Sequence, residues 1–201
     1  QLCDNQSSSS QLTAHGYFMN SNARPHERLL DLRNMLDDLV ADGLMDRRDA
    51  NFLAGSPRSR ENALLHPLTF IAKMNLQDQQ RPGKLLDEER LTHWLAEKCG
   101  QPYFHIDPLK IDVSKTTTDV MSFAFAKRHQ ILCVQLGKEE MTIASSQPWI
   151  YAWEADIKHT ARREIRRVVV KPSDLARYTV EFYSLSQSVS GASDTDYGNS
   201  I

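Results

Sequence analysis

Leucines recur at helical spacing in the first part of the chain. Between residues 24 and 63 they lie three or four positions apart, at Leu29, Leu32, Leu36 and Leu39, and this spacing predicts one apolar stripe along a helix. Gly43 is expected to end that helix, and Asp46 to cap a second, short one. We therefore expect residues 24–63 to form a helical hairpin and its connector. Because the hairpin has little core of its own, its apolar side should dock onto the next element or onto another protein.

The helical pattern continues through residues 64–107, which we expect to form a helical subdomain broken at residues 80–83. Asp87 should cap the helix that follows the break, and Gly100 should end it. The buried face of this helix is predicted by apolar residues at the same spacing, which are Leu91, Trp94, Leu95 and Cys99.

Strand and helix patterns alternate in residues 108–185, which we expect to form a small α/β domain. The expected elements are a helix capped by Thr116 or Thr117 and running through His129, strands at residues 131–136, 141–143 and 167–171, a helix carrying Trp149, Trp153 and Ile157 on one face, and a last helix opened by Pro172 and Ser173. The strand, helix, strand order requires a parallel pair with a right-handed crossover. The expected fold class is therefore α/β (α+β), with an N-terminal helical hairpin followed by a small three-stranded mixed sheet covered by helices.

Both ends of the chain lack an apolar pattern. Residues 1–23 are rich in Ser, Gln and Asn, so we expect a disordered N-terminal segment. Residues 186–201 are rich in Gly, Ser, Asp and Asn, which is typical of a linker between domains.

Composition and charge exclude several classes of protein. The chain has 201 residues, 24 Lys and Arg against 26 Asp and Glu, and a formal charge of -2, so no global charge draws it to nucleic acid or to an anionic membrane. Its apolar runs are too short to span a bilayer, so no direct membrane insertion is expected. The three cysteines lie far apart and do not form a disulfide framework, which favours the cytoplasm.

The motifs of common enzymes are missing from the sequence. A phosphate-binding P-loop needs Gly, four residues, then Gly-Lys-Ser/Thr, but Leu85 follows Gly83 and Lys84. A helical zinc motif starting at His26 would need a second His where Leu30 stands. We therefore expect no catalytic residue, no cofactor-binding residue and no metal ligand in this chain.

One cluster of cations is a candidate partner-binding site. Its members are Lys158, Arg162, Arg163, Arg166 and Arg167. They can be solvated charges at a helix end, or they can bind an acidic protein partner or a phosphate, since Arg offers a planar bidentate fork. Single-stranded nucleic acid would require interleaved aromatic residues, and Trp149 and Trp153 are expected on a core face, so nucleic acid is not the expected partner.

Three stretches of the sequence resemble one known family. They are GKLLDEERL at residues 83–91, MSFAFAKRH at residues 121–129 and IRRVVVKP at residues 165–172. Together with the residues between them they are similar to the N-terminal domain of type II secretion and type IV pilus assembly ATPases, the general secretion pathway protein E family. The resemblance covers about residues 64 to 192.

The resemblance implies a non-catalytic recruitment module. In this family such a module docks a motor onto the cytoplasmic domain of an inner-membrane platform protein, so the chain would be cytoplasmic and peripheral to the inner membrane through that partner. It also implies that residues 186–201 lead to an absent ATPase domain, a second partner of the module. That domain would hold the P-loop with ATP and Mg, in a parent that is a homo-hexamer.

The resemblance leaves a cyclic di-GMP sensor as the first alternative. Some relatives bind this dinucleotide through a repeated motif that begins Arg-Leu-Gly. The corresponding stretch here begins Arg81, Pro82, Gly83, with no clean second copy, so we expect weak binding or none. A nucleic-acid adaptor that uses the arginine cluster is the second alternative.

Overall fold

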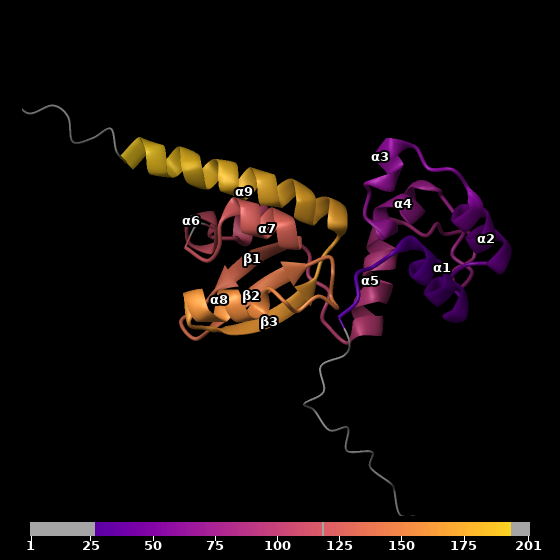
Figure 1. Ribbon diagram of the computed structural model, residues 1–201, viewed down its shortest axis with the longest axis horizontal. Helices are drawn as coiled ribbons and strands as arrows, with labels where there is room; N and C mark the ends of the chain where they lie inside the picture. Colours follow the sequence, from indigo (N-terminus) through magenta and orange to yellow (C-terminus); the bar gives the residue numbers. More distant parts are fainter. Residues whose placement is uncertain (1–26, 118, 194–201) are drawn as a thin grey trace, which may run out of the picture.

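The computed structural model describes residues 27–117 and 119–193 (Figure 1). Residues 1–23, which we expected to be disordered, lie outside this range. The first half of the described chain is helical, with α1 at Leu32–Ala41, α2 at Arg47–Gly55, α3 at Arg60–Ala63, α4 at Pro67–Lys73 and α5 at Glu88–Cys99. The second half contains a 3-10 turn at Pro108–Lys110, α6 at Val113–Thr116, α7 at Phe123–His129, β1 at Ile131–Leu136, β2 at Glu140–Ser145, α8 at Glu154–Ala161, β3 at Glu164–Val169 and α9 at Pro172–Ser193.

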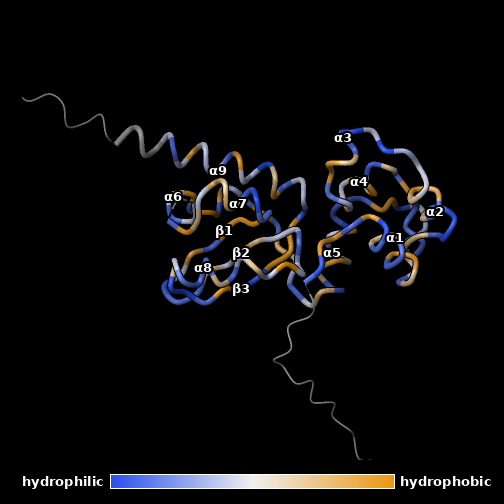
Figure 2. Tube along the Cα trace, viewed as in Figure 1, coloured by the Kyte–Doolittle hydropathy of each residue, from blue (hydrophilic) through white to orange (hydrophobic). Residues whose placement is uncertain are grey.

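The expected fold class is confirmed by the sheet. Its order is β1-β2-β3, with β1 antiparallel to β2 and β2 parallel to β3. In Figure 1, α9 runs along one side of this sheet, while α8 lies beside β3. Figure 2 draws β1 mostly in the colour of hydrophobic residues, in agreement with the burial of its first four residues. Among the described helices, none has both the length and the apolarity needed to cross a membrane.

The apolar side of the hairpin packs on the helices that follow it, which is one of the two outcomes expected from the sequence. Leu36 and Leu39 are buried in one cluster with residues of α4 and α5, because these two helices cover the apolar stripe of α1. Leu29 does not belong to that stripe and is 65 % exposed. The helix begins only at Leu32, since the side chain of Asp31 accepts a hydrogen bond from the backbone N–H of Asn34 and thereby caps it.

Both ends of α5 were predicted correctly from neighbouring residues. The carboxylate of Asp87 accepts a hydrogen bond from the backbone N–H of Arg90 at 2.7 Å, and Gly100 ends the helix with φ +67°. That left-handed conformation favours glycine, which has no Cβ to clash with the carbonyl group.

The helix expected to run from Thr116 or Thr117 through His129 begins only at Phe123, and a separate short helix, α6, ends at Thr116. Ser122, rather than a threonine, caps α7, because its hydroxyl accepts from the N–H of Phe125 at 3.2 Å. The hydroxyls of Thr116 and Thr117 donate back to the carbonyls four residues earlier. They therefore close α6 and cannot cap α7.

Trp149 and Trp153 do not share a helix face, contrary to expectation. The helix α8 starts only at Glu154, and Trp153 stands at its N-cap. Trp149 packs in the core of the helical half, whereas Trp153 is fully buried in the core around the sheet. The segment between them passes from one core to the other.

Two further boundaries differ from those expected. The third strand is Glu164–Val169 rather than residues 167–171, because all six of its residues pair with the six residues of β2. The last helix continues to Ser193, past the boundary expected at Ser186. Ser186 is only 6 % exposed, so the packed face of the helix extends beyond that boundary. The rest of the expected linker, residues 194–201, lies outside the described residues.

Candidate functional site

Arg167 is a structural residue of the cation cluster. Its side chain is only 11 % exposed and pairs with Glu154 at 2.7 Å. Its second terminal nitrogen donates to the carbonyls of Pro148 and Ile150 at 2.8 and 3.0 Å, and its guanidinium lies 4.3 Å from the ring centroid of Tyr151. Arg167 therefore holds the loop before α8 against β3, and it is not available to a partner.

Arg163 and Lys158 also have partners within the chain. Arg163 donates to the carbonyls of Gly137 and Ala161 at 2.8 and 3.1 Å. The ammonium of Lys158 pairs with the carboxylate of Glu164 at 2.7 Å. These contacts close the ends of α8 and of the turn between β1 and β2.

Arg162 and Arg166 are the exposed members of the cluster. Arg162 follows α8 in a left-handed conformation, with φ +51°. Arg166 lies in β3, paired with Thr142, and its side chain is exposed. Neither guanidinium makes a hydrogen bond or an ion pair with another residue in the part of the chain that the structure describes. The sequence therefore predicted five cations that bind a partner, and in the described residues two of the five have no internal hydrogen bond or ion pair.

The stretch that corresponds to the dinucleotide motif is a tight turn. Its backbone closes through hydrogen bonds from Arg81 to Asp78 and from Lys84 to Arg81, both at 3.0 Å. Arg81 lines a polar cavity of about 390 Å³ whose remaining residues are Asp87, Glu89, Arg90, His93 and Glu97. Three of these residues carry carboxylates, which repel a phosphate.

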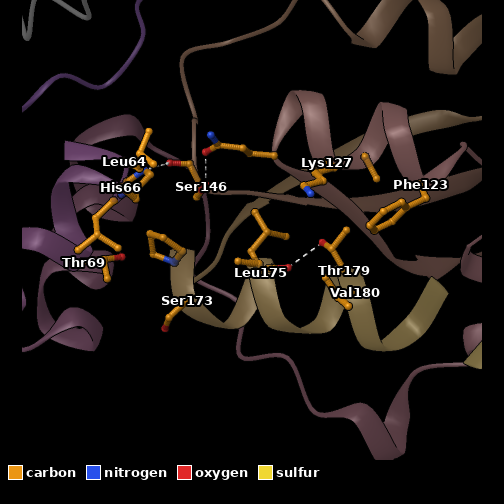
Figure 3. Close-up of a pocket in the computed structure, with 15 residues that line it drawn as sticks. Leu64, His66, Thr69, Phe123, Lys127, Ser146, Ser173, Leu175, Thr179 and Val180 are labelled. Carbon is orange, nitrogen blue, oxygen red and sulfur yellow. Dashed lines mark hydrogen bonds between the residues drawn. The ribbon is translucent and has the colours of Figure 1, made fainter. Parts of the chain in front are cut away.

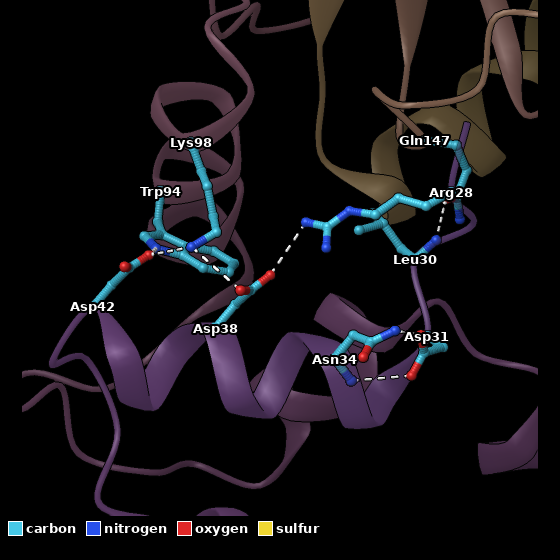
Figure 4. Close-up of polar contacts among 9 residues, drawn as sticks. All are labelled: Arg28, Leu30, Asp31, Asn34, Asp38, Asp42, Trp94, Lys98 and Gln147. Atoms are coloured by element: carbon cyan, nitrogen blue, oxygen red, sulfur yellow. Dashed lines mark hydrogen bonds and ion pairs between the residues drawn. The ribbon is translucent and has the colours of Figure 1, made fainter. Parts of the chain in front are cut away.

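A polar network joins α1 to α5 (Figure 4). Asp42 accepts hydrogen bonds from the indole of Trp94 and from the ammonium of Lys98, both at 2.8 Å. The bond from Lys98 holds the pKa of Asp42 below its usual value. Lys98 also reaches Asp38, and Asp38 in turn pairs with Arg28 at 3.2 Å.

The segment before α1 connects the two halves of the molecule. The backbone N–H of Leu30 donates to the side chain of Gln147 at 3.0 Å, as Figure 4 shows, and the guanidinium of Arg28 stacks over Trp149 at 3.9 Å. On the opposite side, Glu88 of α5 accepts hydrogen bonds from Ser173 of α9 at 2.6 and 3.1 Å. These contacts fix the position of the helical half relative to the sheet.

The described cysteines and histidines do not form a reactive or metal-binding cluster. Cys133 is buried, and burial raises the pKa of its thiol to about 12. Burial likewise raises the pKa of Cys99. Within residues 27–117 and 119–193, no group of His, Cys, Asp and Glu side chains has the arrangement of a metal site.

An apolar pocket lies where α4, α7 and α9 meet, and sequence patterns did not indicate it. Its volume is about 570 Å³, and its walls include His66, Phe123, Lys127 and Leu175 (Figure 3). These residues are separated by many positions along the chain, and no local motif joins them. Only the packing of the helical half against the sheet creates the pocket.

Residues 99–189, which include the sheet and its helices, match the MshEN domain. This match confirms the resemblance inferred from the sequence, which is to the N-terminal domain of type II secretion and type IV pilus assembly ATPases.

One curated relative supports the same class. The chain is 38 % identical over 161 residues to the type IV pilus assembly ATPase TfpB of Acinetobacter baylyi, an alignment that covers 80 % of this chain and 27 % of that protein. It thus spans about a quarter of the length of this curated relative. The solved structure of MshE with cdg has a TM-score of 0.52 at 17 % identity and covers 74 % of this chain and 98 % of that one. The N-terminal domain of XpsE aligns at 12 % identity with a TM-score of 0.46, covering 75 % of this chain and 95 % of that one.

Proposed function

We propose that this chain is a non-catalytic recruitment module, which docks a motor ATPase onto the cytoplasmic domain of an inner-membrane platform protein. The observation that carries the proposal is its 38 % identity to a pilus assembly ATPase of which it spans only about a quarter. Its sequence contains no P-loop, since Gly83-Lys84 and Gly137-Lys138 lack both the upstream Gly and the following Ser or Thr. ATP and Mg would therefore bind in another domain of a hexameric parent.

Arg162 and Arg166 are the residues we assign to docking. Their guanidinium groups are exposed and have no partner among the described residues, so they can meet carboxylates on the platform protein without breaking an internal contact. Charges of this kind accelerate association, and salt screens them. The affinity should therefore fall as the salt concentration rises.

A pair of double variants tests this assignment. Arg162→Glu with Arg166→Glu should weaken binding to the platform's cytoplasmic domain by about 2–5 kcal/mol if the pairs are desolvated, and by under about 1 kcal/mol if they only rim the interface. Arg33→Glu with Arg48→Glu is the matched control, because both residues are exposed helix positions and the change in net charge is the same. Equal affinity of the two double variants, with circular dichroism showing both folded, would remove Arg162 and Arg166 from the interface.

A cyclic dinucleotide is the alternative ligand, since a structure of MshE with cdg shares the fold. Pro82 interrupts the motif here, and the carboxylates of Asp87, Glu89 and Glu97 line the cavity beside Arg81. We therefore expect cyclic di-GMP to bind weakly or not at all. A calorimetric dissociation constant below about 1 μM, roughly 8 kcal/mol of binding free energy, would make dinucleotide sensing the primary function.

Nucleic-acid binding through the arginine cluster has less support. Such binding relies on bases that stack on exposed aromatic rings. Trp149 is 8 % exposed and Trp153 is fully buried, so neither ring near the cluster offers a stacking surface.

A further inference from the structure

The pocket between α4, α7 and α9 opens into a groove with apolar rims. Leu64 forms the rim that precedes α4 and is 84 % exposed, and Val180 forms the rim on α9 and is 51 % exposed. Between them the floor is made by side chains such as Phe123 and Leu175. Large aliphatic side chains exposed on both sides of an apolar pocket are typical of a surface that another molecule covers.

Most polar groups in the wall of this groove already have partners. Thr69 and Ser173 donate to Glu88, each with an oxygen to oxygen distance of 2.6 Å. Thr179 donates to the carbonyl of Leu175 at 2.7 Å. The ring of His66 contacts the carbonyl of Ser146 through Nε2 and accepts from the N–H of Leu68 through Nδ1. An occupant of the groove therefore meets a mostly apolar wall, in which one point carries a full charge.

That point is Lys127, in the last turn of α7. It is the one side chain with a full charge among the described residues that line the groove, because burial lowers the pKa of His66 to about 4 and leaves that ring neutral. Lys127 is exposed and makes no ion pair with a described residue. Figure 3 draws its ammonium group directed toward the α9 side of the groove, above Leu175 and Thr179. A carboxylate on the occupant would pair with it.

We propose that this groove binds an amphipathic helix of a partner protein, which inserts large aliphatic side chains and presents a carboxylate to Lys127. A small molecule confined to the pocket would leave the exposed side chains of Leu64 and Val180 in water, whereas a helix, whose diameter with side chains is about 10–12 Å, is broad enough to cover apolar surface beside the pocket as well. Helices bind such grooves through residues spaced three or four positions apart. Since α4 belongs to the helical half and α9 to the sheet half, the bound helix also holds the two halves together.

This surface is separate from the one assigned to platform docking. The groove lies on the α9 side of the sheet, whereas Arg162 and Arg166 lie at the end of α8 and in β3 (Figure 1). The proposal therefore does not depend on the platform protein, and it can be tested without it.

The test uses a display library of amphipathic peptides of about 16 residues, long enough to be helical, with leucine fixed along one face and the other positions random. Panning against the folded 201-residue chain should enrich peptides that carry Asp or Glu at one preferred position. The best peptide is then synthesised, and its affinity is measured by fluorescence anisotropy.

Two variants and their matched controls assign the binding to the groove. Val180→Glu should lower the affinity for the peptide by about tenfold or more, since it places a charge on an apolar rim. Leu185→Glu, on the same helix, 55 % exposed and outside the groove, should leave the affinity unchanged. Lys127→Glu should lower the affinity for the acidic peptide. In a second panning, this variant should enrich peptides with Lys or Arg at the same position. Arg128→Glu, the neighbour that does not line the groove, should do neither.

Four outcomes would overturn the proposal. They are a library that shows no enrichment, enriched peptides without a charge preference, an affinity that Val180→Glu does not change, and an acidic preference that persists in Lys127→Glu. If peptides fail and dodecanoate binds in a manner that Val180→Glu abolishes, the groove takes a small apolar anion and not a helix.

Discussion

Truncating Arg167 should destabilise the whole molecule. In Arg167→Ala the carboxylate of Glu154, whose side chain is 9 % exposed, loses its ion pair. The carbonyls of Pro148 and Ile150 lose their hydrogen bonds from the guanidinium as well. The free energy of unfolding should fall by about 3–5 kcal/mol, the range for removing one partner of a buried ion pair. For a chain of this size that corresponds to a melting temperature lower by roughly 6–20 °C.

The measurement is urea unfolding followed by tryptophan fluorescence, because Trp149 and Trp153 flank the loop that Arg167 holds. Arg162→Ala is the control, and its effect should stay within about 0.5 kcal/mol because the side chain is exposed and unpaired. The double variant Arg167→Met with Glu154→Gln should be more stable than Arg167→Ala, since it removes both charges of the ion pair together. A loss below about 1 kcal/mol in Arg167→Ala, or a double variant no more stable than Arg167→Ala, would refute a buried structural pair.

Three further predictions concern stability. Burial lowers the pKa of His66 to about 4, and protonation of the ring would remove the acceptor for the N–H of Leu68. The free energy of unfolding should therefore be highest above about pH 6.5 and fall by up to about 3 kcal/mol towards pH 4. In urea titrations at these two pH values, His66→Asn should show a smaller difference than the wild type. Gly100→Ala should cost about 1 kcal/mol because φ there is +67°, and an unchanged urea midpoint would contradict that reasoning. Asp42→Asn should lower the free energy of unfolding by under about 1 kcal/mol at neutral pH, because its bond to Lys98 is weaker. This difference in stability from the wild type should vanish as the pH falls through the lowered pKa of Asp42.

The sequence predicted those elements whose signals are local. Asp87 and Gly100 mark the ends of α5 through backbone hydrogen bonding and a left-handed conformation, and both depend only on adjacent residues. The strands β1 and β2 were predicted for the same reason, since their apolar residues are contiguous or alternate. The parallel pairing of β2 with β3 was predicted because a helix, α8, lies between these two strands in the sequence.

Features that depend on long-range packing were not predicted. The spacing of Trp149 and Trp153 is that of one helix face, yet the two rings belong to different cores. The cation cluster looks uniform in the sequence, but the carbonyls and carboxylates that occupy Arg163 and Arg167 come from other segments. The groove beside Lys127 is formed by helices more than forty positions apart, and no pattern within a single helix reveals it.

Recruitment to the membrane is the central claim, and the location of this chain tests it most directly. The 201-residue chain, fused to a fluorescent protein, is expressed in its source organism, with the gene of the proposed platform protein either present or deleted. The account predicts fluorescence at the cell envelope when the platform protein is present and diffuse cytoplasmic fluorescence when it is deleted. Diffuse fluorescence in both strains, at equal levels of intact fusion protein, would contradict a recruitment module.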